Sequence, residues 1–174
     1  MQSIRTMAAL LALTASLPAF AGKPTLLLTP ISYAPEASIP DKIKTECKID
    51  DLFAMSIGEA LRKNGGGTTT SIEAPAGTQV MKVKVTYVLG VGGGGWTGPK
   101  LVSLQADMLE DGKVRRSEKF QRTTKGGVLG PFMGTCGLIQ RCVTALAKDL
   151  REWSEVDIDV PQAATEPQAA TAEQ

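Results

Sequence analysis

The chain has 174 residues, with 19 lysines and arginines against 18 aspartates and glutamates, and it contains no histidine. This balance argues against a nucleic-acid-binding protein, which needs a basic face to displace counterions, and against a polybasic binder of membrane surfaces. Without histidine, the chain lacks the commonest general base of enzymes and a frequent metal ligand. The length predicts one domain with an ordinary core.

Residues 1–21 have the features of a cleavable export signal. Arg5 supplies a positive start, residues 7–17 are apolar, and Ala19 and Ala21 form the small-x-small pair that precedes cleavage. The apolar run is shorter than the roughly 20 residues that cross a bilayer. We therefore expect cleavage after Ala21 and a periplasmic mature chain with no integral membrane segment. A buried N-terminal helix is the alternative. No cysteine stands at the cleavage point, so we expect no lipid anchor there.

The remaining sequence divides into a folded part and a tail. Residues 22–158 carry regular apolar patterns and are expected to form a single domain. Residues 159–174 contain PQAAT twice, with no aromatic residue and no apolar period. Such a segment cannot bury enough apolar surface to offset the entropy of ordering. We expect it to be a disordered tail of Ala, Gln, Pro and Thr.

The first expected elements are a strand, a proline-rich connection and a helix. Residues 25–29 (TLLLT) form a continuous apolar run, which predicts a strand covered on both faces or a short core segment. After the connection, Asp50 or Asp51 is expected to cap a helix. Asn64 and the glycines at 65–67 end this helix, because glycine accepts a left-handed conformation. The apolar residues that recur on one face of it are Phe53, Ile57, Ala60 and Leu61.

A series of strands follows. Residues 68–73 are polar and predict a weak edge strand. Residues 80–89 and 101–109 alternate between apolar and polar side chains, and Asp111-Gly112 predicts a two-residue hairpin turn into a strand over 114–124. The side chains expected to face the core are Met81, Val83, Val85, Tyr87 and Leu89 in the first strand, and Val102, Leu104, Ala106 and Met108 in the second. Lys82, Lys84 and Thr86 are expected on the opposite face.

The last expected element is a helix over residues 137–154. Its buried stripe is Leu138 or Ile139, Cys142, Val143, Leu146, Leu150 and Trp153, whereas Lys148, Asp149, Arg151 and Glu152 form its solvated face. The complete order predicts an α+β fold, with a mostly antiparallel sheet of four to five strands. Because the row of Lys82 and Lys84 occupies one face of that sheet, we expect both helices to pack on the other face.

Three cysteines remain after export, which favours a disulfide. If Cys136 and Cys142 lie on one helix, they are about 9 Å apart, beyond the roughly 7 Å limit for bonded Cα atoms. Cys47 precedes the first helix, and two helices that run the same way begin at one end of the sheet. We therefore favour a Cys47–Cys136 disulfide with Cys142 as a small buried hydrophobe, and Cys47–Cys142 remains the alternative. The lack of histidine and of a C-x-x-C pair argues against a metal site.

The glycine-rich run at 90–95 satisfies G-x-G-x-x-G, but a dinucleotide fingerprint requires a helix directly after the glycines. Here Trp96 and a further alternating strand follow, so we expect a long hairpin connection and no nucleotide or other cofactor. Trp96 either folds back over the core or serves as an exposed anchor for a partner. Phe132, in a second glycine-rich stretch, permits the same two interpretations.

No set of residues suggests a catalytic site. The adjacent carboxylates Asp50 and Asp51 are interpreted as helix-capping residues, and Glu110 and Asp111 as turn residues. Asp157 and Asp159 border the tail and are expected to be solvated. We therefore expect a protein that is not an enzyme, with a hydrolase working through carboxylates alone as the weakest alternative.

The runs GGGGWTGPK-LVSLQADMLEDGKV, GG-VLGPFMGTCGLIQRC and LAKDLREW resemble those of uncharacterised exported proteins of proteobacteria, over most of the mature domain. The order of elements is also similar to that of the TolB N-terminal domain and of the CsgG and LPP20-type lipoproteins. This resemblance implies a small α+β domain that contacts other envelope components. The chain departs from the lipoproteins in having no cysteine at the expected cleavage point.

These observations together predict a periplasmic protein that binds an envelope protein or assists assembly. Trp96 and Phe132 are its candidate interaction residues. The main alternative is a protein that binds a small ligand, such as a glycan or lipid fragment, between the helices and the loop around Trp96.

Overall fold

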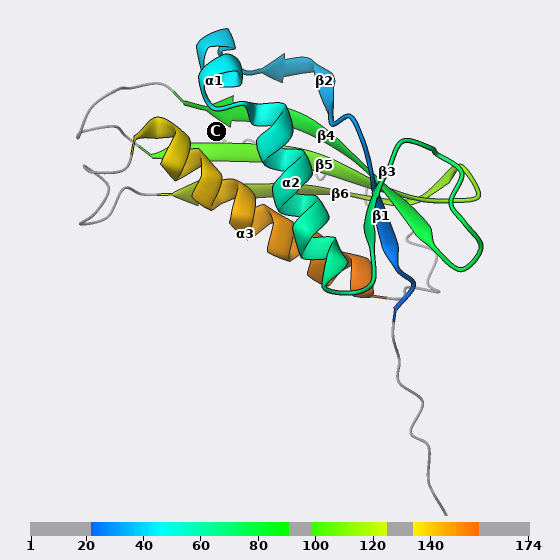
Figure 1. The fold of residues 1–174 in the computed structure, drawn as a ribbon. Coiled ribbons are helices and arrows are strands. Elements are labelled where there is room, and N and C mark those ends of the chain that lie inside the picture. The colour runs from blue at the N-terminus through cyan, green and yellow to red at the C-terminus, as the bar shows by residue number, and fades with distance from the viewer. Residues whose placement is uncertain (1–21, 91–98, 125–133, 157–174) are drawn as a thin grey trace, which may run out of the picture.

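The computed structural model describes residues 22–90, 99–124 and 134–156. These residues form an α+β domain with a six-stranded sheet and three helices, so the predicted class is confirmed (Figure 1). In chain order the elements are β1 (Thr25–Leu28), β2 (Ser32–Ser38), α1 (Asp41–Glu46), α2 (Ile49–Arg62), β3 (Gly67–Thr69), β4 (Gln79–Leu89), β5 (Lys100–Glu110), β6 (Lys113–Thr124) and α3 (Thr135–Glu155).

The sheet has the strand order β3-β1-β4-β5-β6, and β2 pairs with a further part of β4. The long ladders β4–β5 and β5–β6 are antiparallel, whereas β1 and β2 run parallel to β4, and β3 runs parallel to β1. The sheet is therefore mixed but mostly antiparallel. Residues 68–73 were expected to form an edge strand, and β3 is indeed at the edge but shorter.

The region expected to be only a proline-rich connection contains both β2 and α1. Proline is tolerated in an edge strand because such a strand pairs on one side only. Pro35 lies between Tyr33 and Ser38, where the pairing of β2 with β4 shifts register, so its missing N–H interrupts no regular ladder. Pro40 directly precedes the first residue of α1, and proline is tolerated at the beginning of a helix. The expectation of four to five strands and two helices is therefore approximately met, with β2 and α1 as the additional elements among the described residues.

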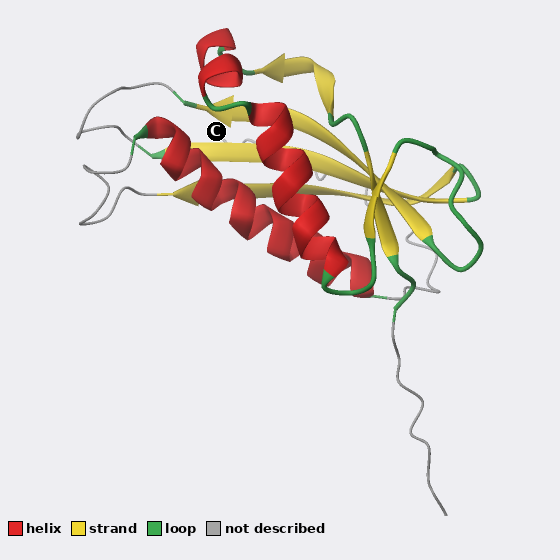
Figure 2. Ribbon diagram, in the orientation of Figure 1, coloured by secondary structure: helices red, strands yellow, loops and turns green. Residues whose placement is uncertain are grey.

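Helices α2 and α3 run side by side and in the same direction across one face of the sheet (Figures 1 and 2). Their inner faces and the facing strand residues form one hydrophobic core. Its fully buried members include Leu27, Ile49, Phe53, Ile57, Leu104, Ile139, Val143, Leu146 and Leu150. The predicted buried stripes of both helices are confirmed, except that Ala60 and Trp153 are only half-buried. Trp153 packs edge-on against Phe120 of β6, with 5.6 Å between ring centroids.

One part of the predicted pattern in β4 is wrong. Met81, Val83 and Val85 face the core as expected, but the register with β5 shifts between Val85 and Tyr87. A bulge adds one residue to a strand and therefore exchanges the two faces beyond it. Val88 is consequently buried, while Tyr87 is 36% exposed and Leu89 is half-buried.

Two local predictions about turns and caps have different outcomes. Asp111 and Gly112 have φ angles of 50° and 73°, so the two-residue hairpin between β5 and β6 is confirmed. The cap of α2 is wrong, because Lys48 occupies the N-cap position in a left-handed conformation. Asp50 and Asp51 instead lie within the first turn, where a negative charge interacts favourably with the helix dipole.

Candidate functional site

A disulfide joins Cys47 to Cys136, which is the pairing that the sequence favours. The two Cα atoms are 5.1 Å apart, within the range of a normal bridge. Cys47 precedes α2 by two residues and Cys136 lies in the first turn of α3. The disulfide therefore ties together the beginnings of the two helices that cover the core.

Cys142 is a free and buried thiol in α3. Burial raises its pKa, and this effect outweighs the opposing effect of a backbone hydrogen bond from Thr124. A thiol with a raised pKa is seldom a thiolate and reacts slowly. Cys142 is thus a core residue, as expected.

The two predicted interaction residues, Trp96 and Phe132, lie outside the described residues, as do the signal sequence, its cleavage site and the C-terminal tail. The segment containing Trp96 is followed by β5, which begins at Lys100. A strand in this position, where a nucleotide-binding loop needs a helix, agrees with the interpretation of the glycines as a hairpin connection.

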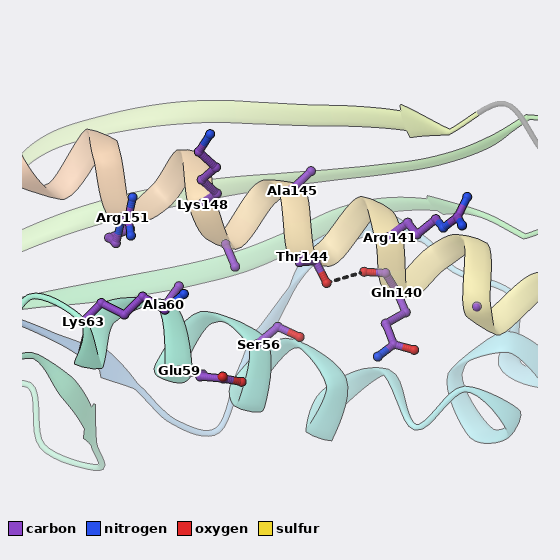
Figure 3. Close-up of a pocket in the computed structure, with 12 residues that line it drawn as sticks. Ser56, Glu59, Ala60, Lys63, Gln140, Arg141, Thr144, Ala145, Lys148 and Arg151 are labelled. Carbon is purple, nitrogen blue, oxygen red and sulfur yellow. Dashed lines mark hydrogen bonds between the residues drawn. The ribbon is translucent and has the colours of Figure 1, made fainter.

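The outer surfaces of α2 and α3 form a groove of about 840 Å³ that is open to solvent (Figure 3). We call it the α2–α3 groove. Its floor consists of small side chains that are buried or half-buried, namely Ser56 and Ala60 from α2 and Gly137 and Ala147 from α3. Longer polar side chains border the floor: Glu59, Lys63, Gln140, Arg141, Lys148 and Arg151.

The border of the groove is mostly basic, with four cationic side chains and one carboxylate, Glu59. The side chains of Lys63 and Arg141 form no ion pair or hydrogen bond with the described part of the chain. Lys148 is 3.6 Å from Glu152, and both side chains are largely exposed, so this pair neutralises little of the groove's charge.

Arg151 differs from the other three cations because its side chain is only 25% exposed. Its Nε is 3.6 Å from a carboxylate oxygen of Glu155, which is longer than a hydrogen bond. The same Nε is buried and has no hydrogen-bond partner among the described residues. Another guanidinium nitrogen of Arg151 is 3.8 Å from Glu152, so the charge of Arg151 is partly compensated. Among the described residues, the uncompensated positive charge of the groove comes from Lys63 and Arg141.

The opposite surface of the sheet is also polar, and on it the carboxylate of Asp107 is satisfied by neighbouring side chains. We call it the open face, defined by Lys82, Lys84, Gln105, Asp107 and Ser117. Asp107 accepts hydrogen bonds from Lys84 at 2.8 Å, Gln105 at 3.0 Å and Ser117 at 2.6 Å. Burial alone raises the pKa of Asp107, but these hydrogen bonds and the charge of Lys84 together hold it below its usual value.

The carboxylates considered for catalysis either have a hydrogen-bond or ion-pair partner or lie exposed on the surface. Asp50 accepts a hydrogen bond from the Tyr33 hydroxyl, and Asp51 is exposed. Burial and then the bond to Asp50 raise the pKa of Tyr33, whose ring also has Lys44 Nζ 3.9 Å from its centroid. Glu110 is paired with Lys23 and Arg115. Within the described ranges, no group of three or more potential ligands could hold a metal ion.

A second cavity, of about 470 Å³, lies at the other end of the helices. It is bordered by Gly22 and Lys23 at the start of the described chain and by Asn64 and Glu155. Asn64 donates a hydrogen bond to Glu155, so the polar groups here are paired with each other. This hydrogen bond joins the turn that follows α2 to the last residue of α3.

The groove residues were missed as a site because the sequence shows them only as the solvated outer residues of two helices. Ser56 and Gln140 are 84 positions apart in the chain, and only the side-by-side packing of α2 and α3 brings their elements together. The usable signal was the combination of small and basic residues at helical spacing in the last helix, from Gly137 to Arg151.

No helix within the described ranges combines the length and apolar character needed to cross a membrane. No protein-family model and no curated protein matches the chain. Solved structures with a similar fold include a Xanthomonas campestris protein of the family DUF330, at 15% identity and a TM-score of 0.49, covering 80% of this chain and 88% of that one. Another is the PelC dodecamer of Paraburkholderia phytofirmans, at 13% identity and a TM-score of 0.45, covering 82% and 93%. Both neighbours are bacterial proteins, and both are too distant to assign a function.

Proposed function

We propose that the protein is a non-enzymatic protein of the periplasm that binds another envelope protein, as a binding partner or an assembly accessory. The observation that carries this proposal is the α2–α3 groove, whose basic border includes Lys63 and Arg141, two side chains with no partner in the described part of the chain. Exposed charges that a surface leaves without partners are available to a second molecule.

Two further observations support export. Residues 1–21 have the pattern of a cleavable signal, and the Cys47–Cys136 disulfide requires an oxidising compartment in most organisms. The resemblance of the sequence motifs to exported proteobacterial proteins adds to this support.

The shape of the groove favours a protein partner over a small ligand. Small-molecule sites bury most of the ligand in a concave pocket lined mainly by apolar and aromatic groups. The α2–α3 groove is open and runs along two helices, and none of the described residues that line it is aromatic. A peptide segment of a partner protein can lie along such a groove over several turns of α2 and α3.

A photocrosslinking experiment in cells tests the proposed function. A benzoylphenylalanine photocrosslinker replaces Gln140, which points towards the groove in Figure 3. In a matched control it replaces Lys119, which is exposed on β6 and paired in register with Gln105 of the open face. We expect a discrete envelope-protein adduct from position 140 that is lost with Arg141→Glu. Equal adducts from both positions, or none from position 140, would contradict the proposal.

A further inference from the structure

The cations of α3 that border the groove have a regular spacing. Arg141 and Lys148 are seven residues apart, which places them on the same side of the helix with a rise of roughly 10.5 Å between them. Both side chains are exposed. Two positive charges separated by two helical turns match two carboxylates with the same separation on an adjacent helix.

The floor of the groove suits the close approach of another helix. Helices pack with their axes about 8–10 Å apart when the side chains between them are small. Here the floor consists of Ser56, Ala60, Gly137 and Ala147. Gly137 and Arg151 are 14 positions apart in α3, so the groove follows a length of roughly 21 Å, which accommodates about four turns.

The same surface suits an extended segment poorly. An extended chain needs partners for its backbone N–H and C=O groups, and a pair of helices has no strand edge to supply them. A helix satisfies these groups internally and presents only its side chains. The strands at the two ends of the sheet order, β3 and β6, could pair with an added strand, but no described residue of either lines the groove.

On these grounds we propose that the α2–α3 groove binds an acidic α-helix of a partner protein. Two carboxylates of that helix, seven residues apart, face Arg141 and Lys148, and its small or apolar side chains rest on Ala60 and Ala147. The proposal rests on the proposed function and names the class of segment that the partner inserts. Lys63 and Arg151 extend the positive charge towards the other end of the groove.

Synthetic peptides test this proposal with the purified full chain. The first probe is a 16-residue, terminally blocked and side-chain-stapled helix of alanine, leucine and glutamine, with glutamates at positions 4 and 11. The matched control has the same composition but glutamates at positions 4 and 13, which lie on opposite sides of a helix because nine residues span two and a half turns. We expect the first peptide to bind at least tenfold more tightly, as measured by fluorescence anisotropy.

Charge reversal identifies the surface that is responsible. In the double variant R141E/K148E, we expect at least a tenfold loss of affinity for the glutamate peptide and a gain for a peptide with lysines at positions 4 and 11. Lys119→Glu serves as the matched control on the open face and should change the dissociation constant less than twofold.

Equal affinity for the two glutamate peptides, or an unchanged affinity in R141E/K148E, would overturn the proposal. Displacement of the bound peptide by phosphatidylglycerol vesicles would also overturn it, because the groove would then bind a lipid surface. A dimer of the chain that R141E/K148E disrupts would overturn it as well, because a second copy would then occupy the groove. If the adduct from position 140 persists while neither peptide binds, the acidic-helix proposal fails and the proposed function stands. If both experiments fail, both proposals fail.

Discussion

The open face and the α2–α3 groove are both rich in charged side chains, but the buried carboxylate of Asp107 on the open face and the exposed cations of the groove differ in how their charges are compensated. On the open face, the carboxylate of Asp107 is 6% exposed and accepts three hydrogen bonds from neighbouring side chains. In the groove, Lys63 and Arg141 extend without a side-chain partner among the described residues. A charged side chain that is already hydrogen-bonded within the fold is therefore less available to a partner than one that extends into solvent.

The same difference predicts which charged side chains stabilise the fold and which are available for binding. Charges that are buried and hydrogen-bonded to each other stabilise the fold, and removing one of them leaves the others unsatisfied. Charges that project into solvent contribute little to stability. Substitutions on the two surfaces should therefore affect different measurements, and the same contrast exists between the inner and outer sides of α2.

The largest expected effect concerns the inner side of α2. Phe53→Ala removes a fully buried ring from the core and should lower the free energy of unfolding by about 3–5 kcal/mol. Met55→Ala, two residues away and 70% exposed, should change it by less than about 0.5 kcal/mol. Urea denaturation followed by far-ultraviolet circular dichroism gives both values. Similar losses in the two variants would show that α2 does not pack as described.

A second prediction concerns the Cys47–Cys136 disulfide, which joins the beginnings of α2 and α3. The double variant C47S/C136S opens a disulfide between residues 89 positions apart and should lower the free energy of unfolding by about 2–5 kcal/mol. Each single variant should lose a comparable amount, because either one removes the bond. Cys142→Ala, with no disulfide to break, should retain the oxidised bridge. A double variant as stable as the wild type would contradict a structural role for the disulfide.

A third prediction concerns the buried carboxylate of Asp107 on the open face. Asp107→Asn should lower the free energy of unfolding by about 1–3 kcal/mol at pH 7, because Lys84 loses a charged hydrogen-bond acceptor. The lowered pKa of Asp107 means that its stabilising effect is present above about pH 4 and is lost as the pH falls through the folded-state value. The difference between wild type and variant should thus shrink in acid. A difference independent of pH would contradict the assigned hydrogen bonds.

The smallest expected effect is on the groove itself. Arg141→Glu should change the free energy of unfolding by less than about 0.5 kcal/mol, because the arginine is exposed and has no ion-pair partner among the residues that the structure describes. The same variant should nevertheless abolish the crosslinked adduct from position 140. A stability loss above 1 kcal/mol would mean that Arg141 has a structural role that the described contacts do not include.

The parts of the fold that follow from local pattern could be predicted from the sequence. The helical stripe of α3, the hairpin at Asp111-Gly112 and the inward residues of β5 each depend on a repeat or a turn chemistry within a few residues. The favoured Cys47–Cys136 disulfide could also be predicted from the sequence, because the spacing of Cys136 and Cys142 on one helix disfavours a bridge between them.

The parts that depend on distant segments could not be predicted. The bulge between Val85 and Tyr87 arises from pairing with β5, and nothing in the alternation of β4 indicates it. Strand β2 exists because it pairs with β4, although its own sequence, SYAPEAS, has a weak strand pattern. The groove requires two helices from distant parts of the chain, so its residues were interpreted only as solvated positions.

The most direct test of the account is to map the acidic helical peptide onto the protein by nuclear magnetic resonance. Backbone amide signals of the isotope-labelled chain are followed during titration with the peptide that carries glutamates at positions 4 and 11. The account predicts shifts concentrated in residues 56–63 and 137–151, which border the α2–α3 groove. Shifts concentrated in the strands of the open face, around Lys84 and Asp107, would contradict it.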